Sequence, residues 1–170
     1  MKELIIGLGN PEDVYTHTYH NAGRWCVNVL AGEEEFETQR AAQCALAKKH
    51  DIILAKSLVA MNKSGQAVKN VIAYTNAPLE AVTILHDDTD LTLGQVKIQT
   101  GRGSGGHHGV DSVFAHLGTE NIRRVRLGVR PPRFQGKKAD EFVLKRVREE
   151  DYEQMQAMFQ RIEEELGTDV

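Results

Sequence analysis

The sequence predicts an α/β domain of three layers, in which helices cover both faces of a β-sheet. Short β-rich runs alternate along the chain with segments whose apolar residues recur at helical spacing, which is the pattern of a helix-flanked sheet. The 170 residues are 41% hydrophobic and 26% charged, which suits one folded core and excludes a disordered or fibrous chain. There is no internal repeat, low-complexity stretch or linker, so we expect residues 1–170 to form a single domain.

Six short runs predict the strands of the sheet. Each is rich in β-branched or aliphatic residues, and turn formers such as Gly7-Leu8-Gly9-Asn10-Pro11 separate them. The run at 82–85 is continuously apolar, as in a buried strand, whereas the runs at 96–99 and 124–129 alternate apolar and polar residues. In chain order, the expected strands are Leu4–Ile6, Cys44–Ala47, Ile52–Lys56, Val82–Leu85, Val96–Gln99 and Arg124–Val129.

Four segments predict helices because their apolar residues share one face. Residues 22–31 place Trp25, Val29 and Leu30 on the inner face, and residues 64–74 carry apolar residues at the same spacing. Residues 110–117 form a third helix, and residues 151–166 form an amphipathic helix near the C-terminus. The inward residues expected of the last helix are Met155, Met158, Phe159 and Ile162.

Charge is unevenly distributed along the chain. The formal net charge is −3, yet residues 97–148 carry twelve Lys and Arg against four Asp and Glu, a local charge of +8. Residues 149–170 carry one basic residue against eight acidic ones, a local charge of −7. A basic segment within an acidic protein is suited to contact phosphate, and solvated loops are the simpler explanation; charge alone leaves both open.

Nothing in the sequence predicts contact with a membrane or an oxidising compartment. The longest apolar runs, such as Ile52-Ile53-Leu54-Ala55, are far too short to span a bilayer, and the first residues lack a signal-peptide core. Cys26 and Cys44 lie in apolar contexts without metal-type spacing, so we expect reduced core thiols. These features predict a cytoplasmic protein.

Three loops carry residues that are suited to chemistry. They are residues 7–21, residues 61–65, and the pair formed by His86-Asp87-Asp88 and the glycine-rich stretch 101–109. Each adjoins a predicted strand, so all three can meet at one end of the sheet, where open α/β folds place their sites. His20 is the natural general base because imidazole titrates near neutral pH, and Asp87 is the carboxylate best placed to orient it. The amides of Asn10 and Asn62 can orient water and substrate, and Asn62 can also donate to an oxyanion.

Other polar residues have simpler explanations. His17, His50 and His116 are expected to be surface residues, and Asp88 and Asp90 are typical turn formers. Asn62 could simply begin the following helix, and Met61 could simply belong to the core.

Two rival chemistries are weaker. His20, His86-Asp87 and His107-His108 could supply metal ligands, but adjacent ligands point apart and no HxH or HExxH pattern is present. Gly7-Leu8-Gly9 after a strand hints at a nucleotide-binding turn, but Glu12 stands where the third glycine would be. We therefore expect no metal and no cofactor.

Taken together, four motifs resemble those of the bacterial-type peptidyl-tRNA hydrolase family. They occur in the family's order over residues 3–145 and fall on the loops chosen above. The matching segments are Ile6-Gly7-Leu8-Gly9-Asn10-Pro11 with His20-Asn21-Ala22-Gly23, then Met61-Asn62 with Ser64-Gly65, then His86-Asp87-Asp88-Thr89-Asp90-Leu91, and finally Gly105-Gly106-His107 with Arg126-Leu127-Gly128.

The resemblance implies a monomeric α/β protein with a mixed twisted sheet that hydrolyses peptidyl-tRNA without a metal or a membrane. It implies that His20 activates water, Asp87 orients His20, Asn10 helps hold water and the esterified 3′ end, and Asn62 holds the peptide main chain. Further substrate-contacting positions are Tyr15, Asn21, Met61, Gly106 and His108. The positions expected to contact tRNA are Lys97, Arg102, Arg126, Arg130 and Arg133.

The sequence departs from the family pattern at several positions. Gln99 replaces a lysine of the phosphate clamp, His108 replaces an asparagine, Glu12 replaces a glycine, and Tyr19 replaces an arginine. These changes keep open a rival function, a non-catalytic RNA-binding or RNP-assembly protein on the same scaffold. Retention of the base and its orienting acid favours the enzyme, because RNA binding alone needs no such pair.

Overall fold

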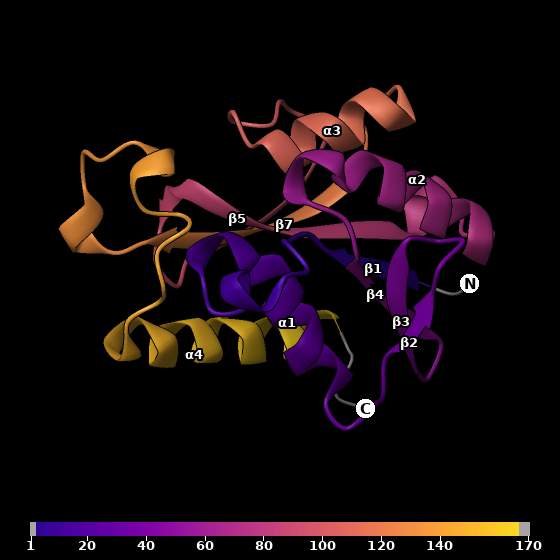
Figure 1. Ribbon diagram of the computed structural model, residues 1–170, viewed down its shortest axis with the longest axis horizontal. Coiled ribbons are helices and arrows are strands. Elements are labelled where there is room, and N and C mark those ends of the chain that lie inside the picture. Colours follow the sequence, from indigo (N-terminus) through magenta and orange to yellow (C-terminus); the bar gives the residue numbers. More distant parts are fainter. Residues whose placement is uncertain (1–2, 167–170) are drawn as a thin grey trace.

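A computed structural model describes residues 3–166 as a seven-stranded sheet in the order β2-β3-β4-β1-β5-β7-β6 (Figure 1). β1 pairs in parallel with β4 and β5, and β5 pairs in parallel with β7. The other pairs are antiparallel, which makes the sheet mixed. The strands are β1 Glu3–Gly7, β2 Glu37–Gln39, β3 Cys44–Lys49, β4 Ile52–Ser57, β5 Val82–Thr92, β6 Val96–Thr100 and β7 Arg123–Arg130.

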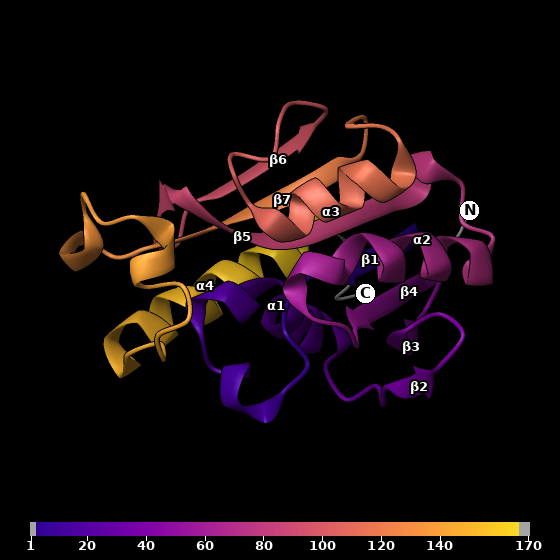
Figure 2. The same ribbon diagram turned by 45° about the horizontal axis from the view of Figure 1, so that its top comes forward.

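Helices cover both faces of this sheet, so the predicted three-layer α/β class is confirmed. α1 and α4 pack on one face and α2 and α3 on the other, as Figures 1 and 2 show from two directions. The four α-helices are α1 Ala22–Ala31, α2 Ser64–Thr75, α3 His108–Leu117 and α4 Glu149–Leu166. Their bounds lie within three residues of those expected from apolar spacing.

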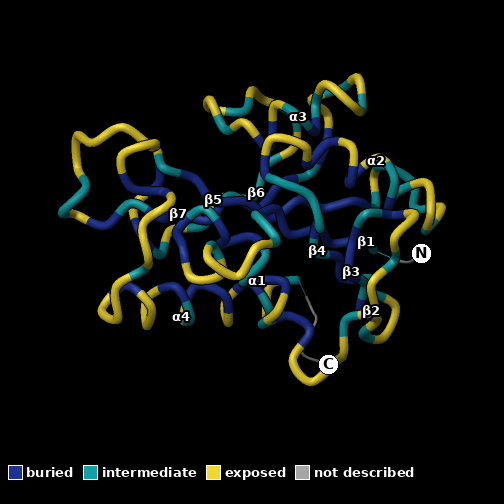
Figure 3. The backbone as a smooth tube through the Cα atoms, viewed as in Figure 1, coloured by how far each residue is buried: buried dark blue, intermediate teal, exposed yellow. Residues whose placement is uncertain are grey.

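The core divides into two layers because successive side chains of a strand point to opposite faces. In β1, Ile5 packs with the layer under α1 and α4, whereas Leu4 and Ile6 pack with the layer under α2 and α3. The inward face predicted for α4 is confirmed, since Met155, Met158, Phe159 and Ile162 are all buried there. Figure 3 shows the buried backbone concentrated in the sheet, with the exposed segments at its edges.

The strand expected at 82–85 is longer than its apolar run suggested. β5 continues to Thr92 because β7 pairs with it through Asp88 and again at Thr92, after an irregularity in the register. β1 pairs with β5 only as far as Leu85. Asp87 is therefore a strand residue that lies beyond the end of its neighbour β1, rather than a residue of a loop. β2 was not expected, because its residues are polar and largely exposed.

A long connection of residues 131–148 joins β7 to α4, and we call it the 131–148 segment. It contains two short 3₁₀ helices, η5 Pro132–Phe134 and η6 Ala139–Glu141, and projects beyond the sheet (Figure 1, orange). Within residues 3–166, no helix is long and apolar enough to span a bilayer.

Candidate active site

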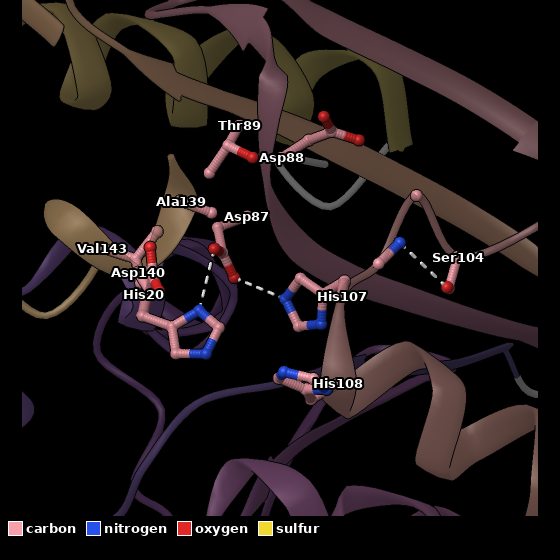
Figure 4. A pocket seen from close by; sticks show the side chains of 12 residues that line it. His20, Asp87, Asp88, Thr89, Ser104, His107, His108, Ala139, Asp140 and Val143 are labelled. Atoms are coloured by element: carbon pink, nitrogen blue, oxygen red, sulfur yellow. Dashed lines mark hydrogen bonds and ion pairs between the residues drawn. The ribbon is translucent and has the colours of Figure 1, made fainter. Parts of the chain in front are cut away.

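The side chains of His20, Asp87 and His107 form one hydrogen-bonded network. His20 Nδ1 lies 2.8 Å from Asp87 Oδ2, and His107 Nε2 lies 2.7 Å from Asp87 Oδ1. Figure 4 shows Asp87 between the two imidazoles, with both contacts drawn. The carboxylate is only 2% exposed, so these contacts are shielded from solvent. The predicted pairing of His20 with Asp87 is thus reproduced in the geometry, and His107 adds a second partner.

Hydrogen-bond partners assign the tautomer of each imidazole. His107 Nδ1 accepts from the backbone N–H groups of Gly109 and Val110, so its proton lies on Nε2 and is donated to Asp87. His20 Nδ1 likewise donates to the carboxylate. The Nε2 atom of neutral His20 is left with a free lone pair, as a general base requires.

The charges of this network shift the ionisation of its members. Burial lowers the pKa of His20, but the attraction and hydrogen bond of Asp87 outweigh burial, and the pKa is raised overall. Burial raises the pKa of Asp87. The two imidazoles outweigh this effect and hold the pKa of its carboxyl well below its usual range. Asp87 is therefore ionised at neutral pH and stabilises the imidazolium form of His20.

Two glycines allow His20 to approach the end of β5. A Cβ on Gly23 would lie 2.3 Å from the Leu85 carbonyl oxygen, and a Cβ on Gly7 would lie 2.3 Å from the Gly23 carbonyl oxygen. The start of α1 consequently packs directly on the backbones of β1 and β5. His20 lies in the 3₁₀ turn Tyr19–Asn21 just before this helix, and its backbone N–H donates to Val143 of the 131–148 segment at 2.9 Å.

The sequence named His107 only as a possible metal ligand and as part of a motif, and predicted no catalytic or binding role for it. It is the N-cap of α3, where its imidazole takes the place of the usual Ser, Thr, Asp or Asn. A histidine directly before a helix, after two glycines, was the available signal. The sequence alone could not show that the helix start would lie against β5.

Behind this network, Arg124 organises the glycine-rich loop. Its side chain is buried, Nη2 donates to the carbonyl oxygens of Gly101, Arg102 and Gly103, and Nη1 donates to His86 Nε2 at 3.3 Å. His86 Nδ1 in turn donates to the Asp87 carbonyl oxygen at 2.7 Å. Burial, then the neighbouring His107, lower the pKa of His86 to about 3, which keeps this imidazole neutral.

A cavity of about 280 Å³ opens over the network. Its walls come from β5, from the glycine-rich loop and from the 131–148 segment, as Figure 4 shows. The lining residues are His20, Asp87, Asp88, Thr89, Ser104, Gly105, Gly106, His107, His108, Ala139, Asp140 and Val143. His108 also borders a second, shallower groove with Asn62 and Asp111. His108 is therefore common to the cavity lined by Gly106 and to the groove lined by Asn62.

The first loop holds the remaining predicted substrate residues together. Asn10 Oδ1 accepts from the Met61 backbone N–H at 2.9 Å, while Asn21 exchanges two hydrogen bonds with the Asn10 backbone. The Asn10 side-chain NH₂ has no partner among residues 3–166, so it is available to a ligand. Met61 is buried in the core and its sulfur lies under Gly109. Tyr15 lies in a 3₁₀ turn, outside the lining of the cavity over His20.

The five predicted tRNA contacts differ in what they bind within the protein. Arg126 Nε donates to Asp88 at 2.5 Å and Nη1 donates to Gln99 at 2.9 Å. Arg130 donates to three backbone carbonyls, and Arg133 binds Asp151 and Glu150. The side chains of Lys97 and Arg102 make no hydrogen bond or ion pair with another residue in the range 3–166.

Tyr19, at the position where the family has arginine, belongs to a buried cluster. Its hydroxyl donates to Asp151 at 2.5 Å and accepts from Arg133 at 2.6 Å. Burial, followed by the hydrogen bond to Asp151, raises the pKa of Tyr19 to about 12. Arg133 belongs to the 131–148 segment and Asp151 to α4, so the cluster holds this segment against the start of α4. The same segment contains Val143, which lines the cavity.

His20, Asp87 and His107 also bring one potential metal-ligating atom each within 4.8 Å of the others. In the tautomers assigned above, both ring nitrogens that face Asp87 carry protons and lack a lone pair for a cation. The cysteines lie elsewhere as free, buried thiols, and burial raises the pKa of Cys44 to about 12. Neither thiol is poised for nucleophilic chemistry.

Comparison with known proteins agrees with this geometry. The sequence model of the family described as peptidyl-tRNA hydrolase matches residues 4–168. A peptidyl-tRNA hydrolase of Bordetella parapertussis is 39% identical over 166 residues, which are 93% of this chain and 77% of the relative. One from Rickettsia bellii is 39% identical over 155 residues, 88% of this chain and 83% of the relative.

A solved structure gives the same result at the level of the fold. The crystal structure of peptidyl-tRNA hydrolase from Acinetobacter baumannii superposes with a TM-score of 0.86 and 30% sequence identity, covering 96% of this chain and 85% of that one. The resemblance inferred from the four motifs is thereby confirmed, and this chain belongs to the peptidyl-tRNA hydrolase family.

Proposed function

We propose that this chain hydrolyses the ester bond of peptidyl-tRNA, releasing free tRNA and a peptide, with His20 as general base. The observation that carries the proposal is the buried Asp87 carboxylate, which accepts the Nδ1 proton of His20 and leaves Nε2 free beside a cavity. We propose further that the chain acts as a monomeric single domain.

The reaction needs one water molecule and no other reactant. The water oxygen attacks the ester carbonyl carbon while His20 Nε2 takes a water proton, and ionised Asp87 stabilises the resulting imidazolium. The tetrahedral intermediate then expels the ribose oxygen, which receives the proton from His20. The products are the tRNA hydroxyl and the peptide acid, and general-base assistance of this kind contributes about 10²- to 10⁴-fold.

Two amide side chains are suited to position the substrate. Asn10 lies outside the lining of the cavity over His20, and its unpaired NH₂ group can bind water or the esterified ribose. Asn62, in the shallower groove with His108, can hold the peptide main chain or the developing oxyanion. His108 lines both neighbouring hollows, and its imidazole N–H can donate to a substrate where the family has an amide.

We propose that Lys97 and Arg102 supply the positively charged side chains that contact RNA phosphate. Both lie in the basic part of the chain, and neither is committed to an acidic residue in the described range. Arg126 contributes to the same edge of the sheet, but its guanidinium is shared with Asp88 and with Gln99. Arg130 and Arg133 serve mainly to hold the 131–148 segment.

The decisive experiment measures release of tRNA from an N-blocked aminoacyl-tRNA by the wild type and by His20→Ala. We expect a fall in kcat of at least about 10²-fold with RNA affinity retained, because His20 supplies the proton transfer. His116→Ala is the matched control, since that imidazole is exposed at the far end of α3. Turnover by His20→Ala near the wild-type rate would overturn the assignment of His20 as the base, whereas RNA binding without turnover by the wild type would favour the RNA-binding alternative.

A further inference from the structure

The backbone carbonyl of Asp87 lies beyond the last strand pair between β1 and β5. The Leu8 N–H donates to the Leu85 carbonyl oxygen at 3.0 Å, and β1 pairs with β5 no further than Leu85. Carbonyl groups two residues apart in a strand point to the same side, so the Asp87 carbonyl faces the side on which β1 has ended. The imidazole of His86 takes the place of the strand there, since its Nδ1 donates to the Asp87 carbonyl oxygen at 2.7 Å.

This hydrogen bond defines the tautomer of His86. A carbonyl oxygen can only accept, so Nδ1 carries the proton and Nε2 carries a lone pair. The Arg124 guanidinium, which can only donate, places Nη1 3.3 Å from that Nε2 atom. A proton on Nε2 would point at the guanidinium, so the carbonyl and Arg124 favour the same neutral tautomer.

The His86 ring also packs against the second imidazole of the site. Its centroid lies 5.0 Å from that of His107, with an angle of 70° between the ring planes. His86 is fully buried and Arg124 is 1% exposed, and neither lines the cavity over His20. One buried ring therefore contacts both the backbone of Asp87 and the residue that donates to the Asp87 carboxylate.

The ionisable groups around His86 agree with a neutral ring. They are His107 from the start of α3, Asp87 from the same strand and Arg124 from β7. Burial is the largest cause of the low pKa of His86, about 3, and His107 lowers this pKa further. Near neutral pH the ring is consequently uncharged, as its contact with Arg124 requires.

We infer that His86 and Arg124 are positioning residues for the pair formed by His20 and Asp87. Arg124 holds the tautomer of His86, and His86 holds the backbone of Asp87 so that the carboxylate meets both His20 and His107. This inference rests on the proposed function, because the position of the carboxylate affects turnover only if His20 acts as the base.

Leucine and asparagine provide a matched pair of replacements for His86. Their side chains have nearly the same shape, and the amide NH₂ of asparagine can occupy the place of Nδ1. His86→Asn therefore keeps a donor for the Asp87 carbonyl and His86→Leu removes it, while both variants remove the ring that contacts His107. With an N-blocked aminoacyl-tRNA, we expect kcat to be about five- to tenfold lower in His86→Leu than in His86→Asn. The two KM values should agree, because His86 touches no substrate. Equal kcat values, or a difference confined to KM, would overturn the inference.

A double-mutant cycle tests whether Arg124 acts through His86. Arg124→Met should lower kcat when His86 is present and have little further effect on kcat in His86→Leu. Its effect on KM should be the same in both backgrounds, because the glycine-rich loop that Arg124 holds continues into the cavity wall at Ser104. Additive effects on kcat would refute the role given to Arg124.

NMR of the histidine rings tests the tautomer in the wild type, where no variant needs to fold. With ¹⁵N-labelled histidine, His86 should keep its proton on Nδ1 and should not titrate between about pH 5 and 8, whereas His20 should titrate in that range. A proton on Nε2 of His86, or titration of its ring in that range, would overturn the inference.

The same spectra separate the positioning role from the proposed reaction. The ring N–H signals of His20 and His107, both hydrogen-bonded to Asp87, should persist in His86→Asn and weaken in His86→Leu. Unchanged signals in His86→Leu would overturn the inference even if hydrolysis is confirmed. Weakened signals without any hydrolysis by the wild type would support the positioning role and refute the proposed reaction.

Discussion

Replacing His107 separates its two roles in the site. Its imidazole donates a hydrogen bond to Asp87 and also caps α3 by accepting from two backbone N–H groups. Asparagine is a good N-cap, but its shorter side chain cannot also donate to Asp87. His107→Asn therefore removes the donor and keeps the cap, whereas His107→Ala removes both.

The expected fall in kcat follows from the burial of the hydrogen bond between His107 and Asp87. Asp87 is 2% exposed and His107 9%, so the hydrogen bond to the carboxylate is little screened by solvent. A hydrogen bond to a charged group contributes about 1.5–3 kcal/mol, and its loss from the transition state lowers kcat by about 10- to 150-fold. The negative charge of Asp87 would then act on His20 alone and raise the pKa of His20 further. His107→Ala should lose about 1 kcal/mol more stability than His107→Asn, because the cap is also lost.

The assay is kcat as a function of pH with an N-blocked aminoacyl-tRNA, together with urea unfolding of both variants. We expect the midpoint of the rising limb to move to higher pH in His107→Asn. A kcat within twofold of the wild type, with the midpoint unmoved, would show that His107 neither orients Asp87 nor shares its charge.

The other predictions concern the base, the RNA contacts, the loop and the metal. In the wild type, kcat should rise with pH through a midpoint above 6.5, because the raised pKa of His20 must be exceeded before Nε2 is free; Asp87→Asn should lower both kcat and this midpoint. A higher midpoint in Asp87→Asn would contradict the assigned charge. Lys97→Ala should reduce the slope of log KM against log salt by about one, since one phosphate contact is lost, and an unchanged slope would remove Lys97 from the RNA site. Arg124→Met should cost about 2–4 kcal/mol in urea unfolding, because three carbonyl groups lose their buried donor; Arg123→Met, at a neighbouring and more exposed position, is the control, and equal stabilities would refute the role given to Arg124. Activity should survive dialysis against a strong chelator, and its loss with recovery on adding zinc would instead favour a metallohydrolase.

Local sequence patterns predicted most elements of the fold. Apolar spacing placed α1, α2 and α4 to within a few residues, because each helix buries one continuous face against the sheet. The sequence predicted that His20 and Asp87 would meet at one end of the sheet, and the structure brings them into contact, whereas Asn62 lies in the neighbouring groove and Asn10 outside the cavity lining. Apolar patterning did not predict β2, because its residues are polar. It also did not predict the second half of β5, because residues 86–92 are held in the strand by pairing with β7 rather than by their own hydrophobicity.

Contacts between distant segments decided the rest of the site. The sequence supplied seven histidines but could not show which imidazole would cap a helix beside β5, and only the packing of α3 brings His107 to Asp87. It placed Arg126, Arg130 and Arg133 in one basic segment, yet the structure gives each of them protein partners. Composition along a chain fixes how much charge a segment holds. The fold decides whether that charge faces solvent or is bound by a carboxylate or carbonyl brought in from elsewhere.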